Sequence, residues 1–141
     1  MTTKQKELAQ EWFAGIYCGD PSVVDRLAAD SVVSSYPVFK RVFGVEALRG
    51  RDEVRKFAAR FVTKWSEGTV VFRDIIAENN SVVLLWSFTA RNIGALADDR
   101  PPTNEFHTWG GITLIRFDAE GRIIEEVGEE SAPGPFERVH S

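Results

Sequence analysis

The stretch that decides the fold runs from Pro101 to Ser131 and reads PPTNEFHTWGGITLIRFDAEGRIIEEVGEES. Polar and aromatic residues are interleaved in two strand-like segments, Glu105 to Phe117 and Arg122 to Ser131. Alternation with a period of two is typical of strands, and the DAEGR sequence between the segments is typical of a turn. We therefore predict two neighbouring strands, one face of which forms the wall of a pocket.

Two further strands are predicted upstream of this pair. The segments Thr69 to Ala77 and Ser81 to Asn92 are separated by Asn79-Asn80, a turn of the hairpin type. A loop rich in Ala, Asp and Pro then runs from Ile93 to Asn104. The second half of the chain therefore has the pattern of an antiparallel sheet.

Helical patterns occupy the first half of the chain. An N-terminal helix ends at Gly19-Asp20-Pro21, and a short helix starts at Pro21. An extended segment runs from Val32 to Phe39, and Gly50 precedes a third helix with the sequence RDEVRKFAARFVTKW. Helices followed by strands indicate an α+β fold, in which helices pack on one face of a curved antiparallel or mixed sheet. We expect one domain over residues 1–141.

The composition narrows the classes of partner. The chain has a net charge of −4, with 17 Lys and Arg scattered among 21 Asp and Glu, so we expect no nucleic-acid partner. No stretch approaches the roughly 20 apolar residues of a membrane span, and the N-terminus is polar from the outset. We therefore expect a cytoplasmic protein with no membrane partner.

Cysteine and histidine are too few for a metal site. Cys18 is the single cysteine, which excludes an internal disulfide, and we expect it to act as a small apolar residue on the first helix. His107 and His140 are the two histidines, and the scattered carboxylates offer no ligand spacing. We therefore expect no metal.

Strand parity selects the first candidate site residues. In the segment from Glu105 to Phe117 the even positions end with Arg116, which places the odd face, with His107 and Thr113, toward the interior. In the last segment the odd face holds Glu129 and Ser131. If both odd faces line a cavity, His107 and Glu129 share one wall, although a single bulge would reverse this parity.

Each candidate has a structural alternative. His107 could be a hydrogen-bonded structural histidine, and Glu129 could belong to a solvated strand edge. Tyr36 could donate a hydrogen bond to an oxyanion or be a core tyrosine with a bonded hydroxyl. Arg91 could pair with Glu129, anchor a polar substrate group or form a surface ion pair. Apolar and small polar residues complete the predicted substrate-binding set: Trp86, Trp109, Phe61, Thr113 and Ser131.

The order of elements resembles the nuclear transport factor 2-like fold, and within it the SnoaL-like polyketide cyclase group. The resemblance covers nearly the whole chain, and the spacing from Pro101 to Phe117 fits the family without a gap. The residues that carry it are Gly19-Asp20, Leu27-Ala28-Ala29-Asp30-Ser31-Val32, Gly50, Val83 to Trp86, Arg91-Asn92-Ile93-Gly94, Pro101-Pro102-Thr103, Gly111-Ile112, Arg116-Phe117 and Gly121-Arg122-Ile123-Ile124-Glu125.

The resemblance implies a cone-shaped α+β barrel that encloses an apolar cavity, and a homodimer. Catalytic members of the family hold one or two acid/base side chains in the cavity and need no cofactor. Moving a proton beside a carbonyl takes a positioned base and an oxyanion donor. The resemblance therefore implies a cyclase, isomerase or dehydratase for a small hydrophobic, carbonyl-bearing or polycyclic substrate. His107 would be the general acid/base, Glu129 its partner, and Tyr36 or Arg91 the polar anchor.

The chain departs from the family at its last strand. Many members have an aromatic residue at the position of Val127 and an aspartate at that of Ser131. Glu129 or Glu130 could replace this aspartate; otherwise the acid/base work rests on His107 or has been lost. Loss would leave a non-catalytic small-molecule-binding or dimeric scaffold protein, since the fold alone does not define a function.

Two further points stay open. Arg91 and Glu129 match two members of the Asp-Arg-Asp set of limonene epoxide hydrolase, but a second aspartate has no matching position, so epoxide hydrolysis is a minor alternative. The apolar stripe of the second strand is either a dimer interface or part of the core: Val82, Leu84, Trp86 and Phe88.

Overall fold

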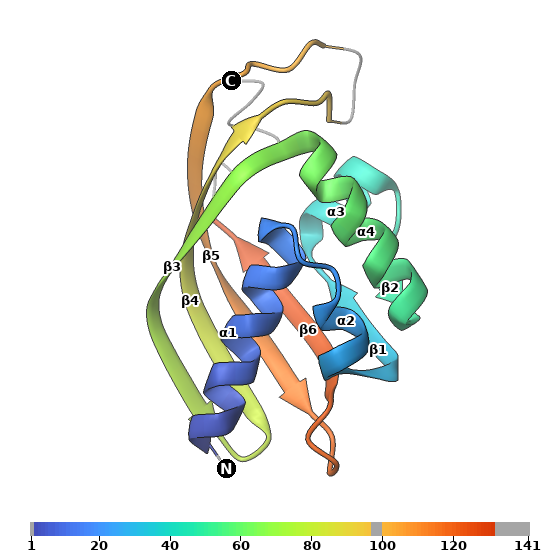
Figure 1. Cartoon of the computed structure of the whole chain (residues 1–141), viewed down its shortest axis with the longest axis vertical. Helices are drawn as coiled ribbons and strands as arrows, with labels where there is room; N and C mark the ends of the chain where they lie inside the picture. The colour runs from blue at the N-terminus through green and yellow to red at the C-terminus, as the bar shows by residue number, and fades with distance from the viewer. Residues whose placement is uncertain (1, 97–99, 132–141) are drawn as a thin grey trace.

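The computed structural model describes residues 2–96 and 100–131. Helices and strands alternate in the first half, and long strands fill the second (Figure 1). In chain order the elements are α1 (Thr2–Cys18), α2 (Val23–Leu27), β1 (Ala28–Ser35), α3 (Pro37–Phe43), β2 (Leu48–Arg49), α4 (Gly50–Lys64), β3 (Trp65–Glu78), β4 (Ser81–Asn92), β5 (Phe106–Phe117) and β6 (Ile123–Glu130).

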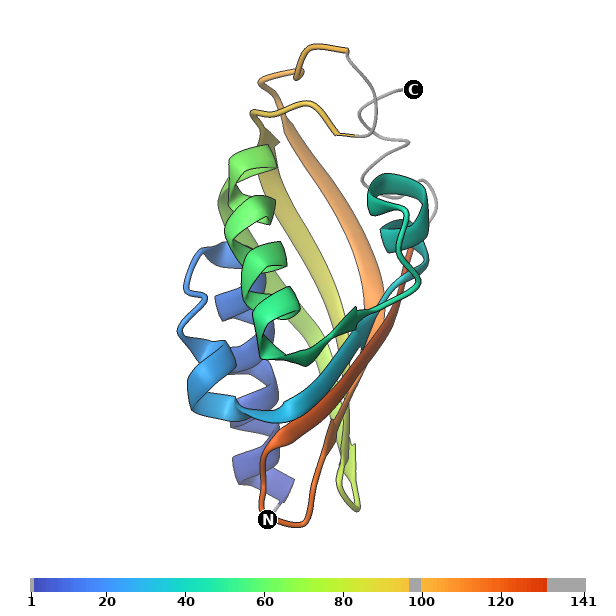
Figure 2. The same cartoon turned by 90° about the vertical axis from the view of Figure 1, so that its right-hand side faces the viewer.

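The strands form one six-stranded mixed sheet with the order β2-β1-β6-β5-β4-β3. β1 and β6 are parallel, and every other neighbouring pair is antiparallel. Helices α1, α2 and α4 lie on one side of the curled sheet (Figure 2), as the α+β prediction requires. The sheet is curled into a cone and does not close, which confirms the predicted fold class.

The extended segment predicted from Val32 to Phe39 is only half correct. β1 ends at Ser35, and α3 begins at Pro37. Proline suits the first turn of a helix, because the N–H that it lacks would have no acceptor within the helix at that position. At the other end, Gly44 ends α3 with a left-handed φ of 71°. These two local signals explain why the chain turns into a helix beside the end of β6.

The inner face of β4 forms the centre of the core. Its even-numbered residues Val82, Leu84, Trp86 and Phe88 are buried beneath the helices. The sequence left open whether this apolar stripe belongs to the core or to a dimer interface. In the structure it belongs to the core. On β5 the odd-numbered residues Trp109, Thr113, Ile115 and Phe117 are likewise buried, and His107 and Gly111 are half-buried, so the parity predicted for that strand is confirmed.

The parity predicted for β6 is wrong, because a bulge lies between β5 and β6. Arg116 pairs with Glu125, but the next residue, Phe117, pairs with Ile123. The extra residue on β6, Ile124, shifts the alternation by one position. Glu126 therefore points into the core, whereas Glu129 lies on the outer face of the sheet.

Candidate functional site

A small apolar cavity lies between the inner face of the sheet and the helices. Its volume is about 50 Å³, and nine of its eleven lining residues are aromatic. The lining residues are Phe13, Tyr17, Tyr36, Val38, Phe39, Phe57, Phe61, Trp86, Phe88, Trp109 and Glu130. The predicted wall residues Phe61, Trp86 and Trp109 are thus all present in the lining.

The rings around the cavity pack edge to face or tilted, and the ring pairs do not form parallel stacks. Tyr17 lies at 79° to Phe61 with ring centroids 5.2 Å apart, and Phe61 lies at 65° to Phe88 with centroids 5.9 Å apart. Such pairs are favourable because the positive edge of one ring meets the negative face of the other. A ligand among these rings meets both edges and faces.

A buried carboxylate, Glu126, lies behind the tyrosines of this cavity. Oε1 accepts hydrogen bonds from Trp12 Nε1 at 2.8 Å and Ser34 Oγ at 3.3 Å. Oε2 accepts from Tyr17 OH at 2.8 Å and Tyr36 OH at 2.6 Å. The side chain is 1% exposed, so these four neutral donors replace the water that a carboxylate requires.

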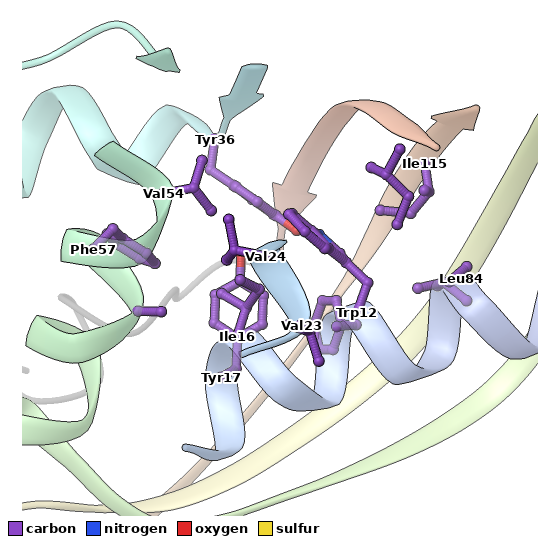
Figure 3. Packing of buried hydrophobic residues seen from close by; sticks show 14 of the residues in the cluster. Trp12, Ile16, Tyr17, Val23, Val24, Tyr36, Val54, Phe57, Leu84 and Ile115 are labelled. Carbon is purple, nitrogen blue, oxygen red and sulfur yellow. The ribbon is translucent and has the colours of Figure 1, made fainter. Parts of the chain in front are cut away.

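Figure 3 shows Tyr36 extending from the end of β1 toward Trp12 on α1. Trp12 and Tyr17 belong to α1, Ser34 belongs to β1, and Tyr36 lies between β1 and α3. The carboxylate therefore ties the helical layer to both parallel strands at the centre of the sheet.

The hydrogen bonds of Tyr36 have a defined direction. Trp86 Nε1 can only donate, and it lies 2.9 Å from Thr113 Oγ1, which in turn lies 2.6 Å from Tyr36 OH. Tyr36 donates its single proton to Glu126, so its oxygen accepts a hydrogen bond from Thr113. The hydroxyl oxygen of Thr113 in turn accepts from Trp86. The chain of hydrogen bonds runs from Trp86 through Thr113 and Tyr36 to the carboxylate.

Both cavity tyrosines are neutral hydroxyls over a wide pH range. Burial, and then the negative charge of Glu126, raise the pKa of Tyr17 and the pKa of Tyr36 well above the ordinary tyrosine value. Both effects disfavour the phenolate.

Gly128 makes room for the Tyr36 ring on β6. A Cβ atom at this position would lie 2.1 Å from Tyr36 Cε2, which no packing tolerates. The glycine is therefore needed for the ring to lie across β6 and bring its hydroxyl to Glu126.

His107 lies outside the cavity lining. Its Nε2 forms a 2.8 Å hydrogen bond with Thr103 Oγ1, and its ring packs edge to face against Trp65. Six positions of β5 separate it from Thr113, which corresponds to about 20 Å along the strand. Thr113 is hydrogen-bonded to Tyr36, so His107 also lies far from Tyr36.

The predicted pairing of His107 with Glu129 does not form, because the bulge places Glu129 on the outer face opposite Ile112. Arg91 does not pair with Glu129 either. Its Nε lies 2.9 Å from Glu67 Oε2, and its guanidinium lies over the ring of Phe106. The surface ion pair is the alternative that the structure supports for Arg91.

Ser131 has a structural contact at the end of the β5–β6 pair. Its Oγ accepts a hydrogen bond from the Gly110 N–H at 3.0 Å, and its own N–H donates to the Gly110 carbonyl. It is exposed and is not part of the cavity lining.

Glu126 and Tyr17 were not predicted as site residues from the sequence, and Glu130 was predicted only as a replacement for the usual aspartate. Glu130 lines the cavity, as its inward parity after the bulge requires. A signal for Glu126 was present in α1: Trp12 and Tyr17 carry polar tips on a helix that buries its apolar face, and such tips need a buried acceptor.

The described residues contain no group of three or more His, Cys, Asp or Glu side chains that could hold a metal ion. No helix in the same part of the chain is both long and apolar enough to cross a membrane.

Comparisons with known proteins agree with this architecture. Residues 9–126 match the family model of the SnoaL-like domain. No curated protein sequence matches the chain.

Three solved structures illustrate the range of similar proteins. A protein from Jannaschia sp. CCS1, assigned as a SnoaL-like polyketide cyclase, has a TM-score of 0.82 at 17% identity, over 99% of this chain and 94% of that one. A Catenulispora acidiphila protein with a ketosteroid isomerase-like fold, in complex with trimethylamine, has a TM-score of 0.73 at 15% identity, over 95% and 92%. A limonene epoxide hydrolase-like enzyme from M. tuberculosis has a TM-score of 0.71 at 14% identity, over 99% and 91%. At these identities the likeness shows the fold alone.

Proposed function

This chain belongs to the SnoaL-like family, and on that premise we propose that it is a cofactor-independent acid/base enzyme. The proposed substrate is a small hydrophobic, carbonyl-bearing molecule, and the reaction is of the cyclase, isomerase or dehydratase type. One observation carries the proposal: the hydroxyl of Tyr36, in the wall of an apolar cavity, donates to the buried carboxylate of Glu126.

The Tyr36–Glu126 pair can move a proton without solvent. In the proposed step the C–H bond beside the carbonyl breaks, and its proton passes to the phenol oxygen of Tyr36. Tyr36 passes its own proton to Glu126, so the ligand becomes an enolate and the carboxylate becomes a carboxylic acid. Reversal of the relay at another carbon or oxygen completes an isomerisation, and the aromatic walls keep water away from the intermediate.

Glu130 replaces Glu129 in this proposal as the carboxylate that faces the cavity. His107 is proposed as a second acid/base group only for a ligand long enough to extend along β5 from the cavity to His107. The separation of about 20 Å along β5 excludes it from acting on the same atom of a small ligand as Tyr36.

Proton–deuterium exchange tests the proposal. Acetone in D₂O, followed by NMR, should exchange its α-protons faster with the protein than in buffer alone. Tyr36→Phe should slow the protein-dependent rate by about 10²- to 10⁴-fold, the usual contribution of a positioned acid/base group. Glu125→Gln, which changes an outer-face residue paired with Arg116, should leave the rate unchanged. Exchange at the buffer rate, or an unaffected Tyr36→Phe variant, would contradict the proposal.

The second candidate function is small-molecule binding without catalysis. The hydroxyl protons of Tyr17 and Tyr36 are already engaged by Glu126, which favours a rigid binding wall over a reactive one. The trimethylamine complex of the Catenulispora acidiphila protein supports the idea that a protein of this fold can serve as a binding protein. The epoxide hydrolase alternative loses its support here, because Arg91 lies on the outer face with Glu67.

We also propose a homodimer that forms through the outer face of the sheet. The register places an apolar row across four strands, with Ile76, Val83, Leu114 and Val127 side by side. Ile76 and Val127 at its ends are exposed. An exposed apolar row across a sheet is typical of an interface.

Light scattering tests this assembly. The wild-type protein should have twice the mass of the chain, and Val127→Lys should give the monomer mass. Val45→Lys, which changes a similarly exposed residue between α3 and β2, should remain dimeric. A monomeric wild-type protein at high concentration would exclude the interface.

A further inference from the structure

We propose that the cavity binds a small organic ammonium ion, with a tertiary or quaternary nitrogen, as the charged group of its ligand. This inference rests on the proposed function in one respect, namely that the aromatic cavity is the ligand site. It adds the chemical class of the ligand, and it holds whether or not the cavity catalyses a reaction.

The carboxylate of Glu126 is a buried negative charge without a positive partner among the described residues. All four hydrogen-bond partners of Glu126 are neutral: Trp12, Ser34, Tyr17 and Tyr36. No Lys, Arg or His of the described residues forms an ion pair with it. Hydrogen bonds distribute the charge of a carboxylate but do not cancel it, and inside a protein the remaining field is weakly screened.

Glu126 lies directly behind the cavity wall, so its electric field extends into the cavity. Tyr17 and Tyr36 donate their hydroxyl protons to Glu126, and both residues line the cavity. A cation in the cavity is therefore separated from the carboxylate by one layer of side chains. A positive ligand gains from this field, and a negative one is disfavoured by it.

The second argument is the chemistry of the walls. Of the eleven lining residues among those that the structure describes, nine are aromatic, none is Lys, Arg or His, and Glu130 carries a charge. Aromatic faces attract cations through the ring quadrupole, and aromatic cages are the known means of binding quaternary ammonium groups. The inclined rings of Tyr17, Phe61 and Phe88 allow a ligand to meet ring faces.

The size of the cavity sets an upper limit on the charged group. A volume of about 50 Å³ corresponds to roughly four water positions, since one buried water needs about 10–15 Å³ by this measure. Trimethylammonium has four heavy atoms, which matches this number, and tetramethylammonium has five, which exceeds it by one. The cavity therefore suits the smallest such groups, and a larger ligand would extend beyond it.

Isosteric probes test the proposal. Tetramethylammonium, tert-butanol and perchlorate each have five heavy atoms in a tetrahedral arrangement and differ in charge. They are titrated at constant ionic strength, with binding followed by tryptophan fluorescence, since Trp86 and Trp109 line the cavity. Tetramethylammonium should bind at least tenfold more tightly than tert-butanol, and perchlorate should bind least.

Glu126→Gln should reduce the preference for tetramethylammonium over tert-butanol to near one, with tert-butanol affinity little changed. The matched control is Glu125→Gln, the neighbouring residue on β6, whose carboxylate pairs with Arg116 on the outer face. This control should keep the wild-type preference. Equal affinity for the neutral probe, or a preference that persists in Glu126→Gln, would overturn the proposal.

The order of the three probes in the wild-type protein keeps the proposal falsifiable if Glu126→Gln does not fold. Binding of none of the probes would also overturn it. The deuterium-exchange experiment separates this inference from the enzyme proposal: a preference for tetramethylammonium without any exchange activity would support the inference and contradict catalysis.

Discussion

Two glutamates that are neighbours on β6 have opposite environments. Glu126 is buried on the inner face, where it accepts four hydrogen bonds from neutral donors. Glu125 lies on the outer face, where its carboxylate pairs with Arg116 at 2.9 Å and is partly exposed to solvent. We therefore expect the two carboxylates to contribute differently to stability. The buried one connects elements of the core through its hydrogen bonds, whereas the outer one is solvated by water and should contribute little.

The largest expected effect comes from removing the buried carboxylate. Glu126→Ala should lower the free energy of unfolding by about 3–5 kcal/mol, since each orphaned buried donor costs roughly 1–3 kcal/mol. Glu125→Ala should cost no more than about 1 kcal/mol, as expected for a surface ion pair. Urea denaturation measures both values, and similar losses for the two variants would remove the contrast between the faces.

A smaller loss is expected when Tyr36 is displaced from the carboxylate. Gly128→Ala places a methyl group against the Tyr36 ring and should cost about 1–3 kcal/mol, with a change in the near-ultraviolet circular dichroism of tyrosine. Val127→Ala changes the preceding, outward-facing residue and should leave that spectrum unchanged. An unaltered tyrosine signal in Gly128→Ala would mean that the ring does not depend on this glycine.

The inner face should also define the response to alkaline pH. The pKa of Tyr36 is raised in the folded state, so the unfolded chain releases its proton first, above the ordinary value of 10.0. Stability contributed by this group is fully present below pH 10 and is lost as the pH rises toward the folded pKa. In that window the loss is about 1.4 kcal/mol per pH unit and per tyrosine.

Tyr36→Phe should therefore flatten the dependence of stability on pH above 10 by one proton. Denaturation curves between pH 8 and pH 11 measure the slope, and ultraviolet absorption of phenolate measures the ionisation itself. An unchanged slope in Tyr36→Phe would show that its hydroxyl ionises equally readily in both states.

The smallest effect belongs to the outer face. Arg91→Ala removes the ion pair with Glu67 and the contact with Phe106, and it should cost about 1 kcal/mol or less. Added salt should reduce this difference further. A loss as large as that of Glu126→Ala would show that the two faces of the sheet do not differ as described.

Much of the fold was predictable because its signals are local. The alternation from Glu105 to Phe117 identified β5 and its inner face, and helical spacing identified α1 and α4. Tyr36, Phe61, Trp86 and Trp109 were predicted as site residues and line the cavity, while their roles stay predictions. The helix α3 was missed although Pro37 and Gly44 mark its two ends, because the valine and phenylalanine residues around them also suit a strand.

The electrostatic centre of the site was not predictable in the same way. Four glutamates surround Gly128, at positions 125, 126, 129 and 130, and local alternation assigns the wrong pair of them to the interior. The bulge at Ile124 arises from pairing with β5, and no residue within β6 signals it. The mistaken choice of Glu129 followed directly from this extra residue, which the sequence does not reveal.

The sequence by itself thus determined the α+β class, the order of the elements apart from α3 and β2, and the aromatic character of the cavity, because periodicity and residue type act over a few neighbouring residues. Tertiary structure alone decided which carboxylate is buried. Glu126 meets donors from α1, from β1 and from the segment after β1. Residues up to 114 positions apart make those contacts, and they exist only after the sheet has paired.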